Sequence, residues 1–329
     1  MSNEEEMKRI WGAFYGQVIG DAIGVTCEFL NVEATAIEMA EVRAKAGRNG
    51  EDSVFPMVGC EDRKIKPGQF TDDTEMALSL ARSLIAKKGF DKVDVACAYS
   101  YWLCGTEPSD SGFTTQRALH TDLFSQTGLK KNVQGHNTQS LSNGALMRIS
   151  SLAIAFRNFS TKELREVAKA DSSLTHANPI VWDAVATYCV ALAALLKGKS
   201  ISEAFDEAFE STKTPMIREY LKDAKTHDIP VKLYQEDFSQ PFKTINGDAE
   251  HQDAIARGGD ADTNGCIVGA LIGARFGVDN IPQEWIDTVR AAEPCRLSNF
   301  NVRKDMDLTF LSIKDIDELV PQLVAICKG

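Results

Sequence analysis

Two short acidic segments, far apart along the chain, carry the residues best suited to chemistry. One contains Asp72 and Asp73, the other contains Asp260 and Asp262, and each also has a threonine hydroxyl and nearby glycines. Hard divalent cations such as Mg²⁺ and Mn²⁺ prefer oxygen ligands of this kind. Four clustered carboxylates would repel one another strongly without a cation between them. The two segments therefore predict one shared metal site.

Helix capping is the alternative interpretation of both segments. Asp and Thr before an apolar run are typical N-cap residues. Capping accounts for one acidic residue in each segment and leaves the second unexplained. We therefore favour the metal site.

The elements that must position these residues are helices. Apolar residues recur at three- and four-residue spacing along the whole chain, and alternating strand patterns are nearly absent. The pattern predicts an all-α fold, a single compact multi-helix domain over residues 1–329 with 293–329 as a less typical C-terminal extension. Helices are expected over residues 73–87, 92–103, 144–156, 162–170, 179–197, 202–211, 264–276, 282–292 and 316–328, and loops near 30–70, 105–112, 125–142 and 225–250.

A repeated glycine spacing indicates how two of these helices pack. Glycines recur at every fourth residue from Gly12 to Gly24 and again from Gly265 to Gly277. Glycine inside a helix costs about 1 kcal/mol relative to alanine, so a row of them needs a compensating close approach of two backbones. We predict a tight crossing of these two helices. Asp262 opens the second of them, so this crossing would hold the metal site in place.

Composition limits the class of protein. The net charge of −11 argues against nucleic-acid binding through the general electrostatic field. The longest apolar run, residues 185–196, is too short to span a bilayer, and the acidic N-terminus is unlike a signal peptide. The eight cysteines show no zinc-ligand spacing and fit a reducing compartment. We expect a cytoplasmic monomer with no nucleic-acid or membrane partner.

Taken together, the motifs resemble those of the ADP-ribosylglycohydrolases, including the dinitrogenase reductase-activating glycohydrolases. The resemblance runs from Gly12 to about Trp285, and its five segments occur in the family's order. It implies an all-α fold, two divalent cations (Mg²⁺ or Mn²⁺), and cleavage of a glycosidic bond at the C1″ carbon of ADP-ribose. The segments are residues 12–29, 68–76, 142–148, 175–176 and 258–264.

The resemblance also implies roles for single residues near the cations. Glu28 matches an acidic position with a catalytic or water-positioning role, and its alternative is a surface or capping carboxylate. Asp110, before Ser111 and Gly112, resembles an Asp-Ile-Gly element whose aspartate is the proposed catalytic carboxylate of arginine-directed members. Without the resemblance, Asp110 is a turn or N-cap residue. The implied metal ligands are Thr71, Asp72, Asp73, Asp260, Asp262 and Thr263.

A polar loop ahead of a helix is expected to contact the substrate. Residues 140–144 precede the helix expected to begin near Gly144, and a helix N-terminus is a natural site for a pyrophosphate. The family uses this loop and a following histidine around ADP-ribose, although Ser142 replaces a common glycine. Outside that context, a lone histidine is more often structural. The implied substrate contacts are Gly112, Ser140, Asn143, Gly144 and His176.

The expected function is metal-dependent removal of ADP-ribose from an ADP-ribosylated protein. Arginine is favoured as the modified side chain because of the Asp110 element. Hydrolysis of ADP-ribosyl-serine or of an O-linked ADP-ribose is one alternative, and a non-catalytic ADP-ribose-binding relative is another. A metal phosphohydrolase would normally add His-Asp pairs, and the chain offers only His227-Asp228.

Overall fold

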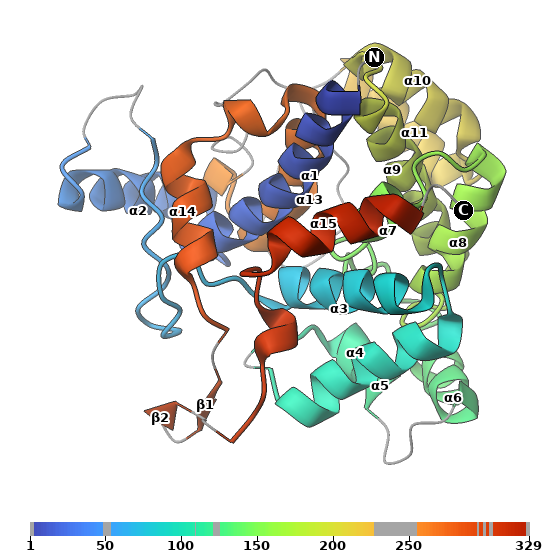
Figure 1. Cartoon of the computed structure of the whole chain (residues 1–329), viewed down its shortest axis with the longest axis horizontal. Helices are drawn as coiled ribbons and strands as arrows, with labels where there is room; N and C mark the ends of the chain where they lie inside the picture. Colours follow the sequence, from blue (N-terminus) through green and yellow to red (C-terminus); the bar gives the residue numbers. More distant parts are fainter. Residues whose placement is uncertain are drawn as a thin grey trace. The chain divides into compact units, whose positions relative to one another are not determined.

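The computed structural model describes residues 3–48, 54–108, 110–120, 126–226, 255–294, 296–298, 301–302 and 305–326. The regular secondary structure of this part of the chain is almost entirely helical, so the all-α prediction is confirmed. Its only strands, β1 (Leu297–Ser298) and β2 (Asn301–Val302), form one short antiparallel pair. The helices in Figure 1 are α1 Asn3–Gly24, α2 Val32–Lys45, α3 Asp72–Lys87, α4 Lys92–Thr106, α5 Phe113–Leu119, α6 Gln126–His136, α7 Ser150–Ala155, α8 Thr161–Ser172, α9 Pro179–Leu196, α10 Ile201–Ser211, α11 Pro215–Thr226, α13 Ala261–Phe276, α14 Gln283–Ala291 and α15 Ile316–Ala325, with single 3₁₀ turns at Val278–Asn280 and Thr309–Leu311.

Two helices occupy stretches that were expected to be loops. α2 lies within 30–70 and α6 within 125–142. The N-cap of α2 is Asn31, whose side chain accepts a hydrogen bond of 2.8 Å from the backbone N–H of Ala34. α2 buries only Thr35 and Val42, so its sequence carries almost no apolar periodicity.

Contacts along the chain divide it into two compact units. Unit 1 combines Met1–Asp73 with Tyr220–Ala292, and unit 2 combines Thr74–Glu219 with Glu293–Gly329. Both acidic segments therefore belong to unit 1, whereas Asp110 and the expected substrate loop belong to unit 2. The single domain expected over residues 1–329 stays a prediction.

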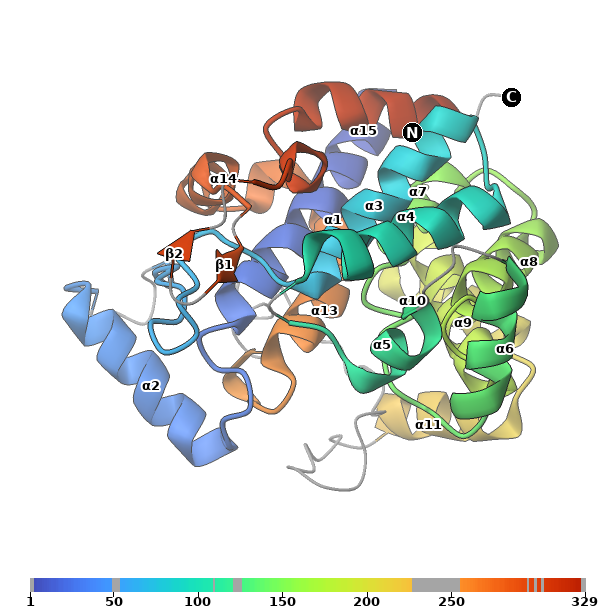
Figure 2. The ribbon, with the colours of Figure 1, turned by 90° about the horizontal axis from the view of Figure 1, so that it is seen from below.

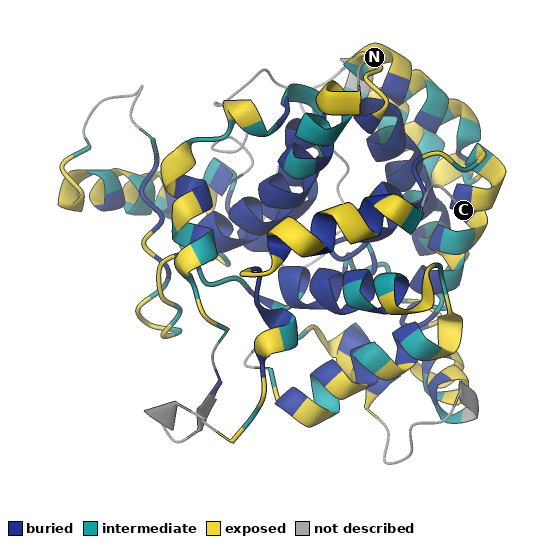
Figure 3. Ribbon diagram, in the orientation of Figure 1, coloured by how far each residue is buried: buried dark blue, intermediate teal, exposed yellow. Residues whose placement is uncertain are grey.

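The core of unit 1 is the antiparallel pair α1 and α13, which lie side by side in Figures 1 and 2. Gly16 faces Gly269 and Gly20 faces Gly265, and a Cβ atom on either α1 glycine would lie less than 3.0 Å from the opposite backbone. The predicted glycine crossing is confirmed. Figure 3 shows α1 buried over most of its length. At the end of the crossing Gly24 contacts the backbone of Asp262, which fixes the start of α13 against α1.

Replacing Gly20 by alanine is expected to lower the free energy of unfolding by about 3 kcal/mol. Overpacking a close-packed interior typically costs about 1–3 kcal/mol, and here the obstacle is rigid backbone at Gly265. Urea unfolding measures the effect. Gly135→Ala in α6 is the matched control, because a Cβ there meets nothing within 4 Å and should stabilise the helix by about 0.5–1 kcal/mol. Equal unfolding curves for the two variants would contradict the tight crossing.

The core of unit 2 is α9, which α7, α8 and α10 contact. Asn178 caps it by accepting a hydrogen bond of 3.0 Å from the backbone N–H of Ile180, and Pro179 occupies the first turn. α9 is long and apolar enough to cross a membrane by length and composition, but 72% of its residues are buried inside the fold. Its apolar character therefore has an explanation in the packing of unit 2.

The C-terminal part of the chain is tied into unit 2 by a buried ion pair. Arg296 donates hydrogen bonds of 2.7 and 2.6 Å to the two carboxylate oxygens of Glu75 in α3. Trp102 Nε1 donates to the same carboxylate at 2.7 Å, and Arg296 also bonds Thr106. Breaking one partner of such a buried pair is strongly destabilising. The segment from Glu293 onward is thus integrated into this unit by buried polar contacts.

Candidate metal centre

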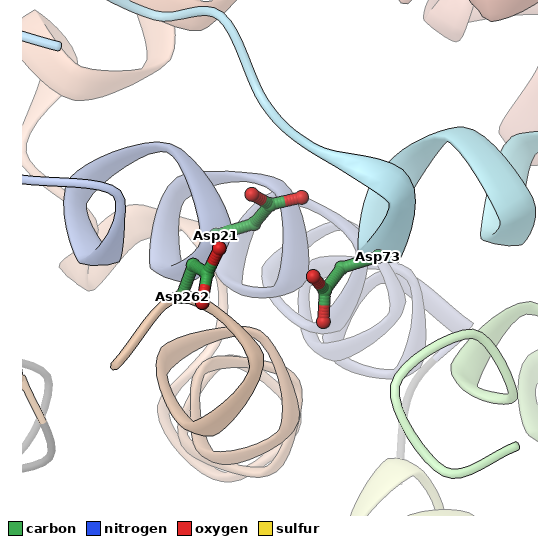
Figure 4. A group of neighbouring side chains, drawn as sticks. All are labelled: Asp21, Asp73 and Asp262. Carbon is green, nitrogen blue, oxygen red and sulfur yellow. The ribbon is translucent and has the colours of Figure 1, made fainter. Parts of the chain in front are cut away.

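Three buried carboxylates converge in unit 1. Asp21 lies in α1, Asp73 in the first turn of α3 and Asp262 in the first turn of α13, and one oxygen of each lies within 4.8 Å of the others. Figure 4 shows the three side chains pointing toward one another. Such a group of oxygen ligands suits a hard divalent cation.

Thr71 links two of these carboxylates. Its backbone N–H donates to Asp21 Oδ1 at 3.0 Å, and its hydroxyl lies 3.0 Å from Asp21 Oδ1 and 2.9 Å from Asp73 Oδ2. The second threonine, Thr263, donates its backbone N–H to Asp262 Oδ1 at 2.9 Å. Both threonines are buried, and they fix the orientation of the carboxylates beside them.

A second group of carboxylates shares Asp262 with the first. Glu28, Asp260 and Asp262 each offer an oxygen within 4.8 Å of the other two. The segment after Glu28 is held by two backbone hydrogen bonds, from Phe29 N–H to the Gly259 carbonyl at 2.7 Å and from Gly259 N–H to the Leu30 carbonyl at 2.8 Å. This pairing brings Glu28 to the second acidic segment. The two carboxylate groups therefore overlap at Asp262.

The first group corrects the expected ligand set in one respect. Asp21 was not among the predicted ligands, although it is a charged residue inside an otherwise apolar glycine helix, which is a detectable signal. Asp72 lies in neither group, and its negative charge contributes to raising the pKa values of Asp73 and Asp262. The structure brings Asp73, Asp260 and Asp262 into these groups, and the metal-ligand roles of all six predicted residues stay predictions.

Electrostatics at the first group favour a cation. Burial raises the pKa of Asp73 well above its ordinary value, and the charges of Asp21, Asp72 and Asp260 raise it further. Burial and the negative charges of the surrounding aspartates raise the pKa of Asp262 well above its ordinary value. Asp73 Oδ1 is also buried without a hydrogen-bond partner among the described residues. An orphaned carboxylate oxygen surrounded by like charges is what a divalent cation would satisfy, so these residues fit the expected metal.

The expected substrate loop in unit 2 forms one hydrogen-bonded cluster around His176. Ser142 Oγ lies 2.9 Å from His176 Nε2, and Thr175 Oγ1 lies 2.9 Å from His176 Nδ1. Ser140 Oγ lies 2.8 Å from the Thr114 hydroxyl and 3.2 Å from that of Ser142. Burial and the charge of Arg148 lower the pKa of His176 to about 3, so its imidazole is neutral at ordinary pH. The structure therefore joins Ser140 and His176, and both ring nitrogens of His176 have hydrogen-bond partners.

The helix expected to begin near Gly144 instead begins at Ser150, as α7. Residues 144–149 form turns, in which the backbone N–H groups of Leu146 and Met147 bond to the Asn143 carbonyl at 2.6 and 3.1 Å. The prediction of a helix N-terminus at this loop is therefore wrong. The contacts assigned to Asn143 and Gly144 rest on the family resemblance alone.

Arg148 organises this loop, a role that sequence reasoning missed. It is fully buried, donates to the Gly144 carbonyl at 2.8 Å, and forms an ion pair of 3.1 Å with Asp171. Its guanidinium also lies 4.5 Å from the ring centre of Tyr99. A buried arginine with this many partners fixes the backbone that follows Asn143.

Asp110 lies in unit 2 on the half-buried segment before α5. The N-cap of α5 is Gly112, so Asp110 does not cap this helix and the N-cap alternative is wrong. Gln116 Nε2 donates to the Ser111 carbonyl at 2.8 Å and to its hydroxyl at 2.9 Å, which fixes the residue after Asp110. The catalytic role of Asp110 and the substrate contact at Gly112 stay predictions. Ser109 and the His227-Asp228 pair lie outside the described residues.

Comparison with known proteins decides the family. The sequence profile of the ADP-ribosylglycohydrolases matches residues 2–309. The chain belongs to the ADP-ribosylglycohydrolase family. Members are glycohydrolases, so the chain is a hydrolase of this class. The resemblance noted in its motifs is thereby confirmed.

Relatives of this glycohydrolase include enzymes whose names state an ADP-ribosylated substrate. It is 30% identical to ADP-ribosyl-[dinitrogen reductase] glycohydrolase of Rhodospirillum rubrum, over 84% of this chain and 89% of that protein. It is 28% identical to ADP-ribosylarginine hydrolase Tri1 of Pseudomonas putida (88% and 76%) and 24% identical to human ADP-ribosylhydrolase ARH3 (85% and 88%). A solved ADP-ribosylglycohydrolase-related protein complex shares the fold, with a TM-score of 0.68 at 23% identity over 99% of both chains.

Arg63 introduces a positive charge at one of the two carboxylate groups of this glycohydrolase. It lies in the tight turn closed by the bridge between Cys60 and Ile65, and its guanidinium forms an ion pair with Glu28. The Glu28 side chain is only 5% exposed, so solvent screens this pair weakly. Arg63 would therefore compete with a cation for Glu28, which belongs to only one of the two groups.

Arg63→Gln is expected to raise the affinity of the group that contains Glu28 for a divalent cation by roughly tenfold, which corresponds to about 1.4 kcal/mol of relieved competition. The glutamine keeps much of the side chain and removes the charge. Isothermal titration of the metal-stripped protein with Mn²⁺ measures this affinity. Arg48→Gln is the matched control, because Arg48 pairs with the exposed Glu284 in the same unit. Unchanged or weaker Mn²⁺ binding in Arg63→Gln would contradict the competition.

Proposed function

We propose that this glycohydrolase releases ADP-ribose from arginine side chains of an ADP-ribosylated protein, with the help of two divalent cations, Mg²⁺ or Mn²⁺. The observation that carries the proposal is the pair of carboxylate groups that share Asp262. The name of one relative, the ADP-ribosylarginine hydrolase Tri1, and the Asp110 element support the choice of linkage.

The proposed chemistry follows from the charge that develops at C1″. Departure of the guanidine gives the ribose oxocarbenium character, which nearby carboxylates stabilise. The bound cations would orient the ribose hydroxyls and lower the pKa of a water molecule. In this proposal Asp110 pairs with the arginine guanidinium, and Asp110 or Glu28 accepts the proton of the attacking water. Ser140, Asn143, Gly144 and His176 hold the ADP-ribose, and the neutral imidazole of His176 acts through hydrogen bonds.

Hydrolysis of ADP-ribosyl-serine or of an O-linked ADP-ribose is the second candidate. It shares the metal centre and the ADP-ribose contacts and differs in the leaving group, for which Glu28 would be the principal carboxylate. The non-catalytic alternative is disfavoured because every predicted carboxylate ligand is present in the chain. We further propose that the protein acts as a cytoplasmic monomer without nucleic-acid or membrane partners.

One panel of substrates tests the linkage. The protein is incubated with arginine-, serine- and O-acetyl-linked ADP-ribose in Mg²⁺ or Mn²⁺, and free ADP-ribose is quantified. We expect turnover of the arginine linkage to exceed that of the other two. Preferential release from the serine or O-acetyl linkage would replace the arginine proposal with the second candidate.

A further inference from the structure

A pocket of about 650 Å³ opens in unit 2 beside the segment that carries Asp110. It lies where the C-terminal end of α4 meets α5 and α6, and these three helices contact one another (Figure 2). Pro108 and Ser111, on either side of Asp110 in sequence, both line it. The volume lies within the range of pockets that hold drug-sized ligands. The pocket thus borders the residue proposed to receive the arginine.

The wall of this pocket is basic, in contrast to the chain as a whole. Arg117, His120 and His136 line it, against a single carboxylate, Glu107, whereas the whole chain has a net charge of −11. Among the described residues, the side chains of these three basic residues make no hydrogen bond or ion pair, and all three residues are exposed. A guanidinium and two imidazoles offer N–H donors to an anionic group, and an arginine recognises a carboxylate through two parallel hydrogen bonds.

Hydrogen bonds link the segments that carry these groups. Asn132 Nδ2 in α6 donates to the backbone carbonyl of His120 at 2.9 Å, which ties the end of α5 to α6. Gln116 holds Ser111 through two hydrogen bonds at the other end of α5. Because both ends of α5 are fixed, Arg117 and His120 are presented from a defined backbone. A basic site on a fixed frame binds an anion with less loss of conformational freedom than a site on a free loop.

We propose that this pocket, defined by Arg117, His120, His136 and Glu107, binds acidic residues of the protein substrate that flank its ADP-ribosylated arginine. The inference rests on the proposed function, because it is the candidate role of Asp110 that places the modified arginine next to the pocket. It adds a substrate class: arginines whose sequence neighbours carry carboxylates. Charge complementarity at such a surface gives specificity for one partner over others.

Fluorescence anisotropy tests the pocket independently of catalysis. Two labelled peptides of equal length are used, each with one central arginine, flanked by glutamates in the first and by glutamines in the second. The parent protein should bind the glutamate peptide about tenfold more tightly. Arg117→Gln should remove most of this preference, and Arg117→Glu should reverse it, so that the glutamine peptide binds more tightly than the glutamate peptide. Both variants change an exposed side chain, and Lys197→Gln, at the exposed end of α9, is the charge-matched control.

The outcomes separate the pocket from the catalytic proposal. Equal affinity of the parent for the two peptides, or an equal loss of preference in Lys197→Gln, would overturn the pocket as an acidic-peptide site. Tighter binding of a single-stranded oligonucleotide than of the glutamate peptide would overturn it in favour of a phosphate backbone. Turnover of free ADP-ribosyl-arginine, which has no flanking residues, reports on the proposed function alone. Its absence together with glutamate-peptide preference would remove the catalytic proposal and leave the pocket in place.

Discussion

Replacing Asp262 by asparagine is expected to weaken Mn²⁺ binding by more than about 100-fold, with a matching loss of hydrolysis. Loss of an outer partner of a metal ligand already costs about 10–100-fold, and Asp262 belongs to both carboxylate groups. Asparagine keeps the shape of the side chain, so helical content should be retained. Equilibrium binding of Mn²⁺ to the metal-stripped proteins measures the change. Asp287→Asn, on the exposed face of α14 in the same unit, is the control.

Two further comparisons show whether both groups take part. Asp73→Asn should affect the first group and leave the second, whereas Asp260→Asn should do the reverse, so each should remove one binding event while Asp262→Asn impairs both. Binding of two ions by Asp262→Asn with parent affinity would contradict a shared centre.

Mg²⁺ or Mn²⁺ should also raise the melting temperature of the parent in a concentration-dependent manner, since a cation that binds only the folded chain stabilises it.

The same variant carries a prediction about pH. The pKa values of Asp73 and Asp262 are raised in the folded chain, so the folded state binds more protons than the unfolded state between the ordinary aspartate pKa and the raised values. In the absence of metal, the contribution of these groups to stability is therefore present at low pH and is lost as pH rises through the raised values. Asp262→Asn should make the free energy of unfolding decline less steeply with rising pH, as measured by urea unfolding without metal. A steeper decline in the variant would contradict the assigned repulsion.

Asp110→Asn is expected to reduce turnover of arginine-linked ADP-ribose by about 10²-fold or more, the usual contribution of general acid–base catalysis. The substitution keeps the size of the side chain and removes the charge that would pair with the guanidinium. Steady-state release of ADP-ribose measures the effect. Binding of free ADP-ribose should change much less, because it depends on the metals and on the loop around Asn143.

A structural role for Asp110 predicts a different result. If Asp110 only shapes the turn before α5, the variant cleaves the arginine linkage at the parent rate. The serine-directed or O-linked function, with Glu28 as the principal carboxylate, would then move ahead. Glu166→Gln is a suitable control for the loss of a carboxylate, since Glu166 is exposed on α8 in the same unit and has no role in the proposed catalysis or in the pocket.

The sequence predicted those parts of the fold in which periodicity and packing act together. The glycine rows of α1 and α13 predicted their crossing because only a close backbone approach compensates for so many helical glycines. The sequence did not predict α2, because this helix buries few side chains and its start depends on the Asn31 cap. α7 begins at Ser150 because Arg148 holds the turns after Asn143, and Arg148 is itself held by a tertiary ion pair with Asp171 that local propensity does not contain.

The candidate site was predictable where the chemistry is local and was missed where it depends on the fold. The paired aspartates predicted the candidate metal centre, and the structure places one oxygen of Asp73 within 4.8 Å of one oxygen of Asp262. Asp21 reaches the same point only because the glycine crossing brings α1 against the start of α13. Arg63 contacts Glu28 from a turn that the hydrogen bond from the Thr26 hydroxyl to the Gly59 carbonyl holds in place. In each case the missing information was a contact between segments distant in sequence.

The release of ADP-ribose from ADP-ribosyl-arginine, measured with and without divalent metal, tests the central claim most directly. The parent protein should release ADP-ribose in millimolar Mn²⁺ or Mg²⁺, lose this activity in excess chelator, and regain it when the metal is restored. Hydrolysis at the full rate by the metal-stripped protein in excess chelator would contradict the proposed role of the carboxylate centre at Asp262.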